Sequence, residues 1–209
     1  PHLDERGEPE YFTGIARDIS EIENAKALLE GQKQVLERVV QGAPLADTLT
    51  ALMRLVETQL PGALGSVLLL EADGRHLRHG AAPSLAPEFI EAIDGVAIGE
   101  GVGSCGTAAF RREEVVVEDI AGDPLWKDFR EMALQHGLRA CWSTPIFGAQ
   151  HRLCGTVAIY HRKPVLKEER ASRVIEMVTG VAAFAHRLNR AAQQLAAARL
   201  GQHGHEAHA

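Results

Sequence analysis

The sequence predicts a fold of the α/β (α+β) class, with long helices at both ends of the chain. Five short runs rich in apolar and β-branched residues have the length of strands: 64–71, 75–81, 114–120, 138–146 and 153–160. Apolar residues at helical spacing recur before, between and after these runs, and the segment 167–199 contains no proline. A glycine-rich stretch, 98–110, interrupts both patterns. Short strand runs that alternate with helical segments point to this fold class.

The N-terminal segment predicts a strand followed by a helix. Residues 11–20 have the apolar content of a strand that ends in Asp-Ile-Ser, and Ser20 is a suitable N-cap for the helix that follows. This segment resembles the last strand of a PAS domain, which commonly carries an Asp-Ile-Thr/Ser motif and leads into a signalling helix. We therefore expect residues 1–20 to be the end of a truncated PAS domain and residues 21–41 to be a linker helix.

Glycine and proline mark the boundaries of the next elements. Gln41-Gly-Ala-Pro44 ends the first helix, and residues 45–60 predict a second helix with its apolar residues on one face. The runs on either side of Asp73-Gly74 predict a β-hairpin, and residues 85–93 predict a short helix.

The stretch from Ile98 to Phe110 holds four glycines in eight residues, a spacing that a regular helix or strand tolerates poorly. We interpret it as a tight turn into a helix with Ser104 as N-cap, so that unpaired N–H groups form one wall of a pocket. Nucleotide binding is not favoured, because a phosphate-binding loop needs a lysine and none occurs between Lys33 and Lys127. The next strand also follows too soon for a dinucleotide-binding crossover helix.

Four motifs follow one another between residues 101 and 160. They are Gly-Val-Gly-Ser-Cys-Gly-Thr-Ala, Val-Val-Val-Glu-Asp-Ile, Gly-Leu-Arg-Ala-Cys-Trp-Ser-Thr-Pro-Ile and Gly-Thr-Val-Ala-Ile-Tyr. In this order they resemble a GAF domain, in particular the GAF modules of bacterial multidomain signalling proteins, and the resemblance covers about residues 33–190. It implies a GAF-like central antiparallel sheet of about six strands, helices on both faces, and long N- and C-terminal signalling helices. We expect a sensory core over 42–166, a dimerisation helix over 167–200 and a disordered tail over 201–209.

The resemblance also implies a ligand cavity between the glycine-rich loop and the segment around Trp126. The candidate ligand-binding residues are Ser104, Cys105, Asp119, Trp126, Phe129, Met132, Cys141, Trp142, Thr144 and Tyr160. Aromatic side chains with a few polar groups suit a small, partly apolar ligand. Two alternatives stay open: the two tryptophans can be ordinary core residues, and Asp119 can cap the turn that follows it.

Cys105 raises the alternative of an enzyme. Free methionine-(R)-sulfoxide reductases are GAF proteins with a cysteine followed by Gly-Thr-Ala, and three cysteines act there in relay. Cys105 matches that motif, whereas Cys141 and Cys154 do not. The Asn-Lys-Phe-Asp-Glu signature of members that bind cyclic nucleotides is absent, and Cys141 lacks the following histidine that is frequent at bilin attachment sites. The cofactor stays unknown, with His136 or His161 as candidate haem ligands, and we predict no metal site.

Composition argues against several partners. At 209 residues with 45% apolar content, the chain is long enough for one sizeable core. The net charge of −6 and the lack of a basic cluster argue against nucleic acid and anionic membranes. No run reaches the roughly 18 apolar residues of a membrane span. Three cysteines without C-x-x-C spacing are typical of buried thiols in the cytoplasm, where we expect this protein.

Apolar residues repeat at coiled-coil spacing in both terminal helices. The predicted dimer interface consists of Ile22, Leu29, Leu36, Val174, Val178, Val181, Ala185, Leu188, Ala192 and Leu195. The alternative for the C-terminal helix is that it packs only on its own sheet.

These observations together predict a non-catalytic sensory and dimerisation module. It would relay ligand binding, or a change in an upstream PAS domain, through its terminal helices to an output domain such as a histidine kinase or a cyclic-di-GMP enzyme. The alternative from another class is a structural adaptor whose pocket is filled by side chains.

Overall fold

Among the residues that the computed structural model describes, 3–4, 6 and 10–206, six strands form one antiparallel sheet. The strand order is β3-β2-β1-β6-β5-β4, and every neighbouring pair is antiparallel. The strands are β1 (Ala63–Leu70), β2 (His76–Ala81), β3 (Val96–Ala97), β4 (Val115–Val117), β5 (Ala140–Phe147) and β6 (Leu153–His161). The expected sheet is confirmed. The sequence did not predict β3, because two residues are too few for a periodic pattern.

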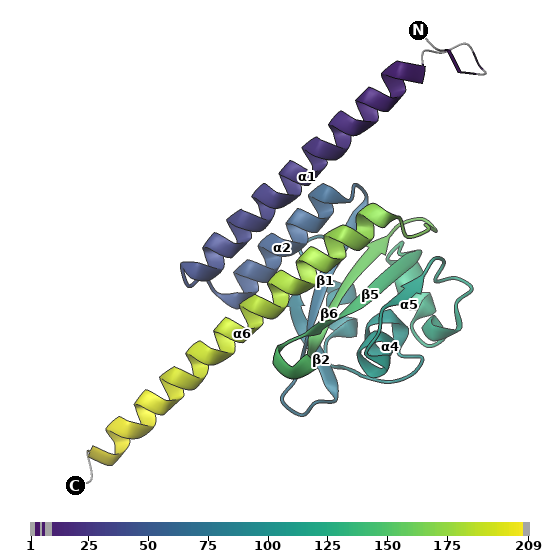
Figure 1. The fold of residues 1–209 in the computed structure, drawn as a ribbon. Coiled ribbons are helices and arrows are strands. Elements are labelled where there is room, and N and C mark those ends of the chain that lie inside the picture. Colours follow the sequence, from purple (N-terminus) through teal and green to yellow (C-terminus); the bar gives the residue numbers. More distant parts are fainter. Residues whose placement is uncertain (1–2, 5, 7–9, 207–209) are drawn as a thin grey trace.

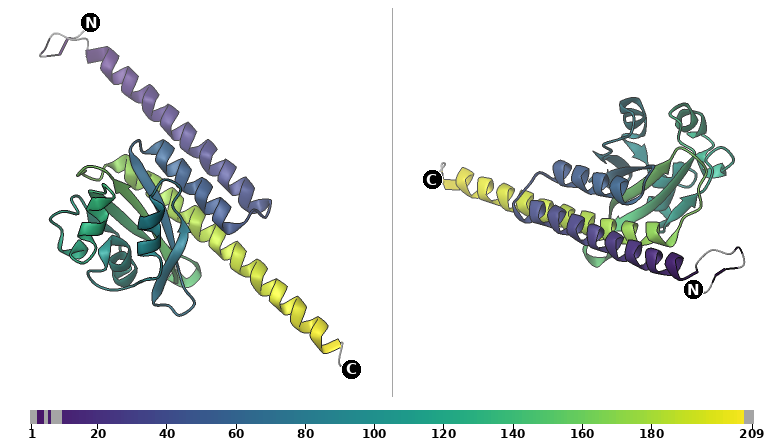
Figure 2. Two further views of the ribbon diagram at one scale, coloured as in Figure 1. Left: turned by 180° about the vertical axis from the view of Figure 1, so that it is seen from behind. Right: turned by 90° about the horizontal axis from the view of Figure 1, so that it is seen from above.

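Helices cover both faces of the sheet, as expected (Figures 1 and 2). On one side lie α1 (Glu10–Val40), α2 (Leu45–Gln59) and α6 (Glu169–Glu206). On the other lie α3 (Pro87–Ile93), α4 (Gly103–Arg111), η1 (Pro124–Trp126) and α5 (Arg130–Gln135), and η2 (Ala149–His151) joins β5 to β6. The N-terminal part of α1 and the C-terminal part of α6 extend beyond the sheet at opposite ends (Figure 1). No helix in the described part of the chain has the length and apolar character that a membrane crossing requires.

The adjacent strands β5 and β6 separate two apolar cores. Trp142 and Ile159 belong to the core on the side of α2 and α6. Cys141 and Tyr160, their neighbours in the chain, belong to the core on the side of α3 and α4. Because both faces are covered, every residue of β6 is buried, which explains why this strand is apolar along its whole length rather than alternating.

Most of the apolar residues that were predicted to form a dimer interface on α6 lie inside the domain. Val174, Val178, Val181 and Ala185 are at most 4% exposed, because they pack in the core that α6 shares with the sheet and α2. A second copy could reach them only if this core opened, so the prediction that these four residues form a dimer interface is wrong. Packing on a sheet and packing in a coiled coil require nearly the same spacing of apolar residues, and the sequence alone did not separate them.

The predicted N-terminal strand is also wrong. Residues 11–20 are part of α1, which begins at Glu10, so Ser20 lies within the helix and is not its N-cap. Extending an existing helix is easier than nucleating one, and the Ala-, Glu- and Lys-rich sequence that follows favours helix. The interpretation of residues 1–20 as the end of a PAS domain depended on this strand and loses its support.

At the other end, the tail predicted to be disordered over 201–209 continues α6 as far as Glu206. The preceding Ala-rich turns provide a helix that propagates through the glycines at these positions. Residues 207–209 lie outside the described residues.

Candidate ligand-binding site

The glycine-rich stretch brings the start of α4 close to β3. Gly101 and Gly103 have φ angles of +74° and +56°, a region that glycine adopts without strain. A Cβ atom at Gly106 would lie 2.7 Å from the Cβ of Val102 and 2.9 Å from the carbonyl oxygen of Ala97. Glycine at this position therefore allows α4 to begin close against β3.

Ser104 joins α4 to two other elements instead of capping the helix. α4 begins at Gly103, and the N-cap residue makes no side-chain hydrogen bond. The buried Oγ of Ser104 accepts a hydrogen bond from Nε1 of Trp126 at 2.9 Å and donates one to the carbonyl oxygen of Cys141 at 3.4 Å. The N-cap prediction is thus wrong, and Ser104 holds η1 and β5 against α4.

A small cavity lies between α4, η1 and the sheet. Its volume is about 20 Å³, which leaves room for about one water molecule. Ten residues line it: Leu68, Ile93, Val96, Val102, Gly103, Ser104, Cys105, Trp126, Phe129 and Tyr160. The last five of these were predicted as ligand-binding residues. Sequence reasoning missed the first five, because an apolar residue at a cavity wall has the same sequence pattern as one in the core. Of these five, only Val102 and Gly103 could have been found from the sequence, because they belong to the glycine-rich stretch.

The remaining predicted residues do not line this cavity. Cys141 is buried in the same core, and Met132 packs against that core. Trp142 and Thr144 project from the opposite face of β5, because side chains alternate along a strand. Trp142 belongs to the core beneath α6, and Oγ1 of Thr144 donates to the Glu114 carboxylate at 2.8 Å. The structure therefore does not bring Trp142, which is a core residue, or Thr144 to this cavity.

Asp119 lies at the surface and caps a turn, as the alternative interpretation described. Its Oδ1 accepts a hydrogen bond from the backbone amide of Ala121 at 3.1 Å, and its Oδ2 lies 3.0 Å from Nη2 of Arg139. The Ala121 amide and then the Arg139 guanidinium lower the pKa of Asp119. Asp119 does not line the cavity, and both of its carboxylate oxygens have partners outside it.

Among the described residues, no histidine lines the cavity. The ring of His161 lies 4.6 Å from that of Trp142 on the side of α6, and burial lowers the pKa of His161. His136 contacts the edge of Phe89, with ring centroids 5.6 Å apart. The structure therefore does not bring either candidate haem ligand to the cavity.

All three cysteines are free and buried, which confirms the expectation of buried thiols. The Sγ of Cys105 lies 3.8 Å from the hydroxyl of Tyr160. Hydrogen bonding, with Cys141 as its largest contributor, lowers the pKa of Cys105 to about 7, whereas burial raises the pKa of Cys141 and of Tyr160. Cys154 belongs to the other core. The cavity thus contains one acidic thiol and, among its lining residues, no charged side chain.

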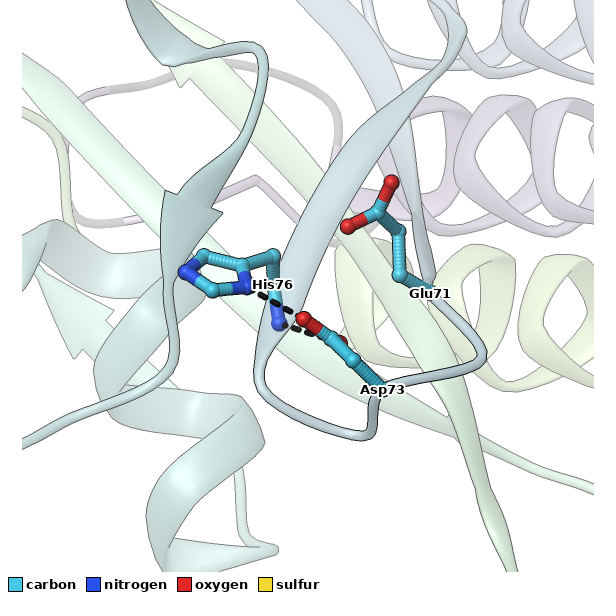
Figure 3. Close-up of side chains that lie close together, drawn as sticks. All are labelled: Glu71, Asp73 and His76. Carbon is cyan, nitrogen blue, oxygen red and sulfur yellow. Dashed lines mark hydrogen bonds and ion pairs between the residues drawn. The ribbon is translucent and has the colours of Figure 1, made fainter.

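Away from the cavity, three potential metal ligands meet at the β1–β2 hairpin (Figure 3). Glu71, Asp73 and His76 each offer an atom within 4.8 Å of the others. Each already has a partner: Glu71 Oε1 accepts from Nε of Arg78 at 2.7 Å, and the Asp73 carboxylate binds the His76 ring. Asp73 Oδ1 also accepts from the Arg75 amide at 2.8 Å. These hydrogen bonds stabilise the turn of the hairpin, and they explain why the three side chains lie close together.

The Asp73 carboxyl should titrate at an unusually low pH. The Arg75 amide and then the His76 side chain lower the pKa of Asp73 from 3.8 to about 2. Because the folded-state pKa is the lower one, this group stabilises the fold above about pH 4, and the stabilisation is lost as the pH falls through about 2. An NMR titration of the carboxyl carbon should give a midpoint near 2, and His76→Ala should raise it. A midpoint at 3.8 in the unaltered protein would show that these bonds do not form in solution.

Comparison with known proteins agrees with this fold. The sequence model of the family described as "GAF domain" matches residues 42–186. The methyl sulfide methyltransferase-associated sensor of Methanosarcina acetivorans is 36% identical over 181 residues, which are 85% of this chain but 18% of that sensor. The chain therefore spans about a fifth of that relative.

Two solved structures share the fold. The GAF domain of a phosphoenolpyruvate-protein phosphotransferase from Coxiella burnetii has a TM-score of 0.63 at 19% identity, covering 81% of this chain and 99% of that one. The free methionine-R-sulfoxide reductase of Neisseria meningitidis, in complex with its substrate, has a TM-score of 0.61 at 15% identity, covering 81% and 91%. At these identities the structures support the fold alone. With more than half of its length matched by the family model, this chain belongs to the GAF domain family.

Proposed function

We propose that this GAF domain is a non-catalytic sensory module that binds a small molecule in the cavity between α4, η1 and the sheet. The observation that carries the proposal is the lining of this small, partly open cavity, in which Ser104 and Cys105 lie among mostly apolar and aromatic side chains. A few polar groups in a mostly apolar cavity are typical of small-molecule sites. A relative named as a sensor supports the same role.

The terminal helices are the proposed route for the signal. α1 and α6 pack against each other and against α2, and they leave the domain at opposite ends (Figure 1). Two adjacent residues of β5 contact opposite sides of the sheet. Cys141 faces the cavity side, and the ring of Trp142 packs in the core beneath α6. A ligand that shifts β5 would therefore move the surroundings of α6. An input domain before α1 and an output domain after α6, such as a histidine kinase or a cyclic-di-GMP enzyme, stay predictions.

We propose a homodimer through the parts of these helices that remain exposed. Ile22 and Leu29 of α1 are 55% and 65% exposed, and Leu188 and Leu195 of α6 are 39% and 63% exposed. With the half-buried Leu36, the residues on α1 repeat every seven positions, and with the exposed Ala192 those on α6 keep the predicted four-three spacing. A second copy of this chain presents the same apolar stripes and would remove them from water.

Ligand binding is tested by native mass spectrometry and a visible absorption spectrum of freshly purified protein. The expected result is a retained small molecule, which Val96→Trp should expel because Val96 lines the cavity. Val116→Trp is the matched control: Val116 is also on an edge strand, but it is 38% exposed and does not line the cavity. If both variants and the parent protein retain no small molecule and bind none from a metabolite library, the structural adaptor is the better description. The small volume of the cavity is the observation that favours this alternative.

The enzyme alternative has a separate test. Reduction of free methionine sulfoxide should proceed no faster with the unaltered protein than with Cys105→Ser. A rate that depends on Cys105 would overturn the non-catalytic assignment.

A further inference from the structure

Two thiols from different elements meet behind the cavity. Cys105 comes from α4, and Cys141 comes from β5, where it is the direct cross-strand partner of Tyr160 in β6. Cross-strand partners project from the same face of a sheet. The hydroxyl of Tyr160 lies 3.8 Å from Sγ of Cys105, and Cys105, Cys141 and Tyr160 belong to the same buried core. The backbone of Cys141 is tied to α4 through Ser104. The two sulfurs therefore share one compartment.

The surroundings of these sulfurs are polar but uncharged. Four fully buried hydroxyls on this side of the sheet complete no hydrogen bond of good geometry: Ser66, Thr107, Ser143 and Thr156. Two of them, Ser143 and Thr156, are among the groups that lower the pKa of Cys105. A buried hydroxyl without a partner is costly, and a thiolate is an acceptor that would satisfy several donors at once. The site is thus suited to hold a negative sulfur without a cationic neighbour.

Access to the sulfurs is limited by size and charge. Cys105 is 7% exposed and lines the cavity, whereas Cys141 is completely buried. The cavity of about 20 Å³ has apolar walls and no charged lining residue. An ionic reagent would lose its hydration there without compensation. A small neutral molecule scarcely larger than water fits these conditions, and Cys105 is the sulfur that it would meet first.

We propose that Cys105 and Cys141 form a dithiol that hydrogen peroxide oxidises to a disulfide. In the first step the thiolate of Cys105 attacks one peroxide oxygen, the O–O bond breaks, and the sulfur becomes a sulfenic acid. The departing hydroxide takes up the proton that Cys105 released and forms water. In the second step the sulfur of Cys141 attacks that of Cys105, the S–O bond breaks, and the hydroxide leaves as water with the proton of Cys141. One peroxide and two thiols give one disulfide and two waters.

The disulfide would join α4 to β5 and fix the inner wall of the cavity. This chemistry does not depend on whether the cavity also binds the small molecule proposed above. Cys154 is the internal control, because its Sγ donates to the carbonyl oxygen of Arg152 at 3.5 Å and it packs in the core on the other side of the sheet.

The oxidation rate should follow the thiolate fraction of Cys105. Among the described residues, the titratable groups that face this sulfur are Cys141 from β5 and Tyr160 from β6, and both have raised pKa values that keep them protonated near neutral pH. With the pKa of Cys105 at about 7, the rate should be about ten-fold lower at pH 6 than at pH 8.

The test uses the reduced chain of 209 residues, treated with hydrogen peroxide, then denatured and alkylated with N-ethylmaleimide for intact mass analysis. The expected product has lost two hydrogens, carries one alkyl group and migrates as a single chain without reductant. Its peptide map should show Cys105 linked to Cys141, and dithiothreitol should restore three alkylated thiols. Cys154→Ser should behave in the same way, whereas Cys105→Ser and Cys141→Ser should form no internal disulfide. In Cys141→Ser the sulfenic acid of Cys105 should be trapped by dimedone.

Three results would overturn the proposal. They are full alkylation of all three thiols after a peroxide treatment that oxidises glutathione, irreversible oxidation of one thiol with no cross-link, or a cross-link that contains Cys154. Circular dichroism checks that the variants are folded, and the peptide map of the unaltered protein decides the outcome even if one variant is not.

Discussion

Replacing Gly155 by alanine is expected to destabilise the domain by about 4 kcal/mol. Gly155 lies in β6 opposite Leu69 of β1, with a φ angle of +156°. A Cβ atom there would lie 2.1 Å from the carbonyl oxygen of Leu68 and 3.0 Å from Cα of Leu69. Both contacts are with backbone, so no side-chain rotation relieves them and the two central strands must separate. Urea denaturation followed by circular dichroism measures the loss.

Gly180→Ala is the matched control for this variant. Gly180 lies within α6 on its exposed side, and an added Cβ would meet no atom within 4 Å. Alanine is favoured over glycine by about 1 kcal/mol in a helix interior, so this variant should be more stable than the parent protein. If Gly155→Ala and Gly180→Ala unfold at the same urea concentration, the close approach of β1 and β6 is not present in solution.

Val178→Asp should unfold the protein, whereas Leu195→Asp should leave each chain folded and disrupt the proposed dimer. Val178 is completely buried in the core beneath α6, and an unpaired carboxylate at that position should cost at least about 4 kcal/mol. Leu195 is 63% exposed and belongs to no core cluster of its own chain. A charge on the central stripe of a helix pair should weaken dimerisation by roughly 100-fold. Thermal denaturation and sedimentation velocity separate the two effects.

Comparing Val178→Asp with Leu195→Asp distinguishes two interpretations of the apolar repeat in α6: a dimer interface along its whole length, or only along its exposed part. If the whole repeat formed the interface, Val178→Asp would give a folded monomer. If the exposed stripe has no partner, Leu195→Asp would leave the sedimentation coefficient unchanged and the parent protein would already be monomeric. The first result would contradict the burial of Val178, and the second would contradict the proposed homodimer.

Local sequence patterns predicted most of the elements and the type of fold. Proline and glycine at Gln41–Pro44 and Asp73-Gly74 restrict the backbone within a few residues, so the turn between α1 and α2 and the β1–β2 hairpin were predictable. The end of α1 was predictable for the same reason, but its beginning was not. For residues 11–20, intrinsic propensities favour strand over helix by only a small free energy. Continuing the adjoining helix through these residues outweighs that difference.

The candidate site was predictable only in part, and strand alternation explains where the prediction failed. Ser104 and Cys105 were found from the glycine-rich stretch, whose backbone demands are local. Cys141, Trp142 and Thr144 are close in sequence, yet only Cys141 faces the cavity side, because the register of β5 against β6 decides the face of each residue.

The sequence by itself determined the antiparallel GAF fold, the glycine-rich entry to α4 and the presence of long terminal helices, since each depends on short-range backbone preferences or on motifs in order. Only the tertiary structure decided which apolar residues remain exposed, that the cavity is nearly filled, and that Cys105 and Cys141 share one compartment. Those features depend on contacts between residues that are far apart in the chain, and an apolar pattern has the same spacing whatever surface finally covers it.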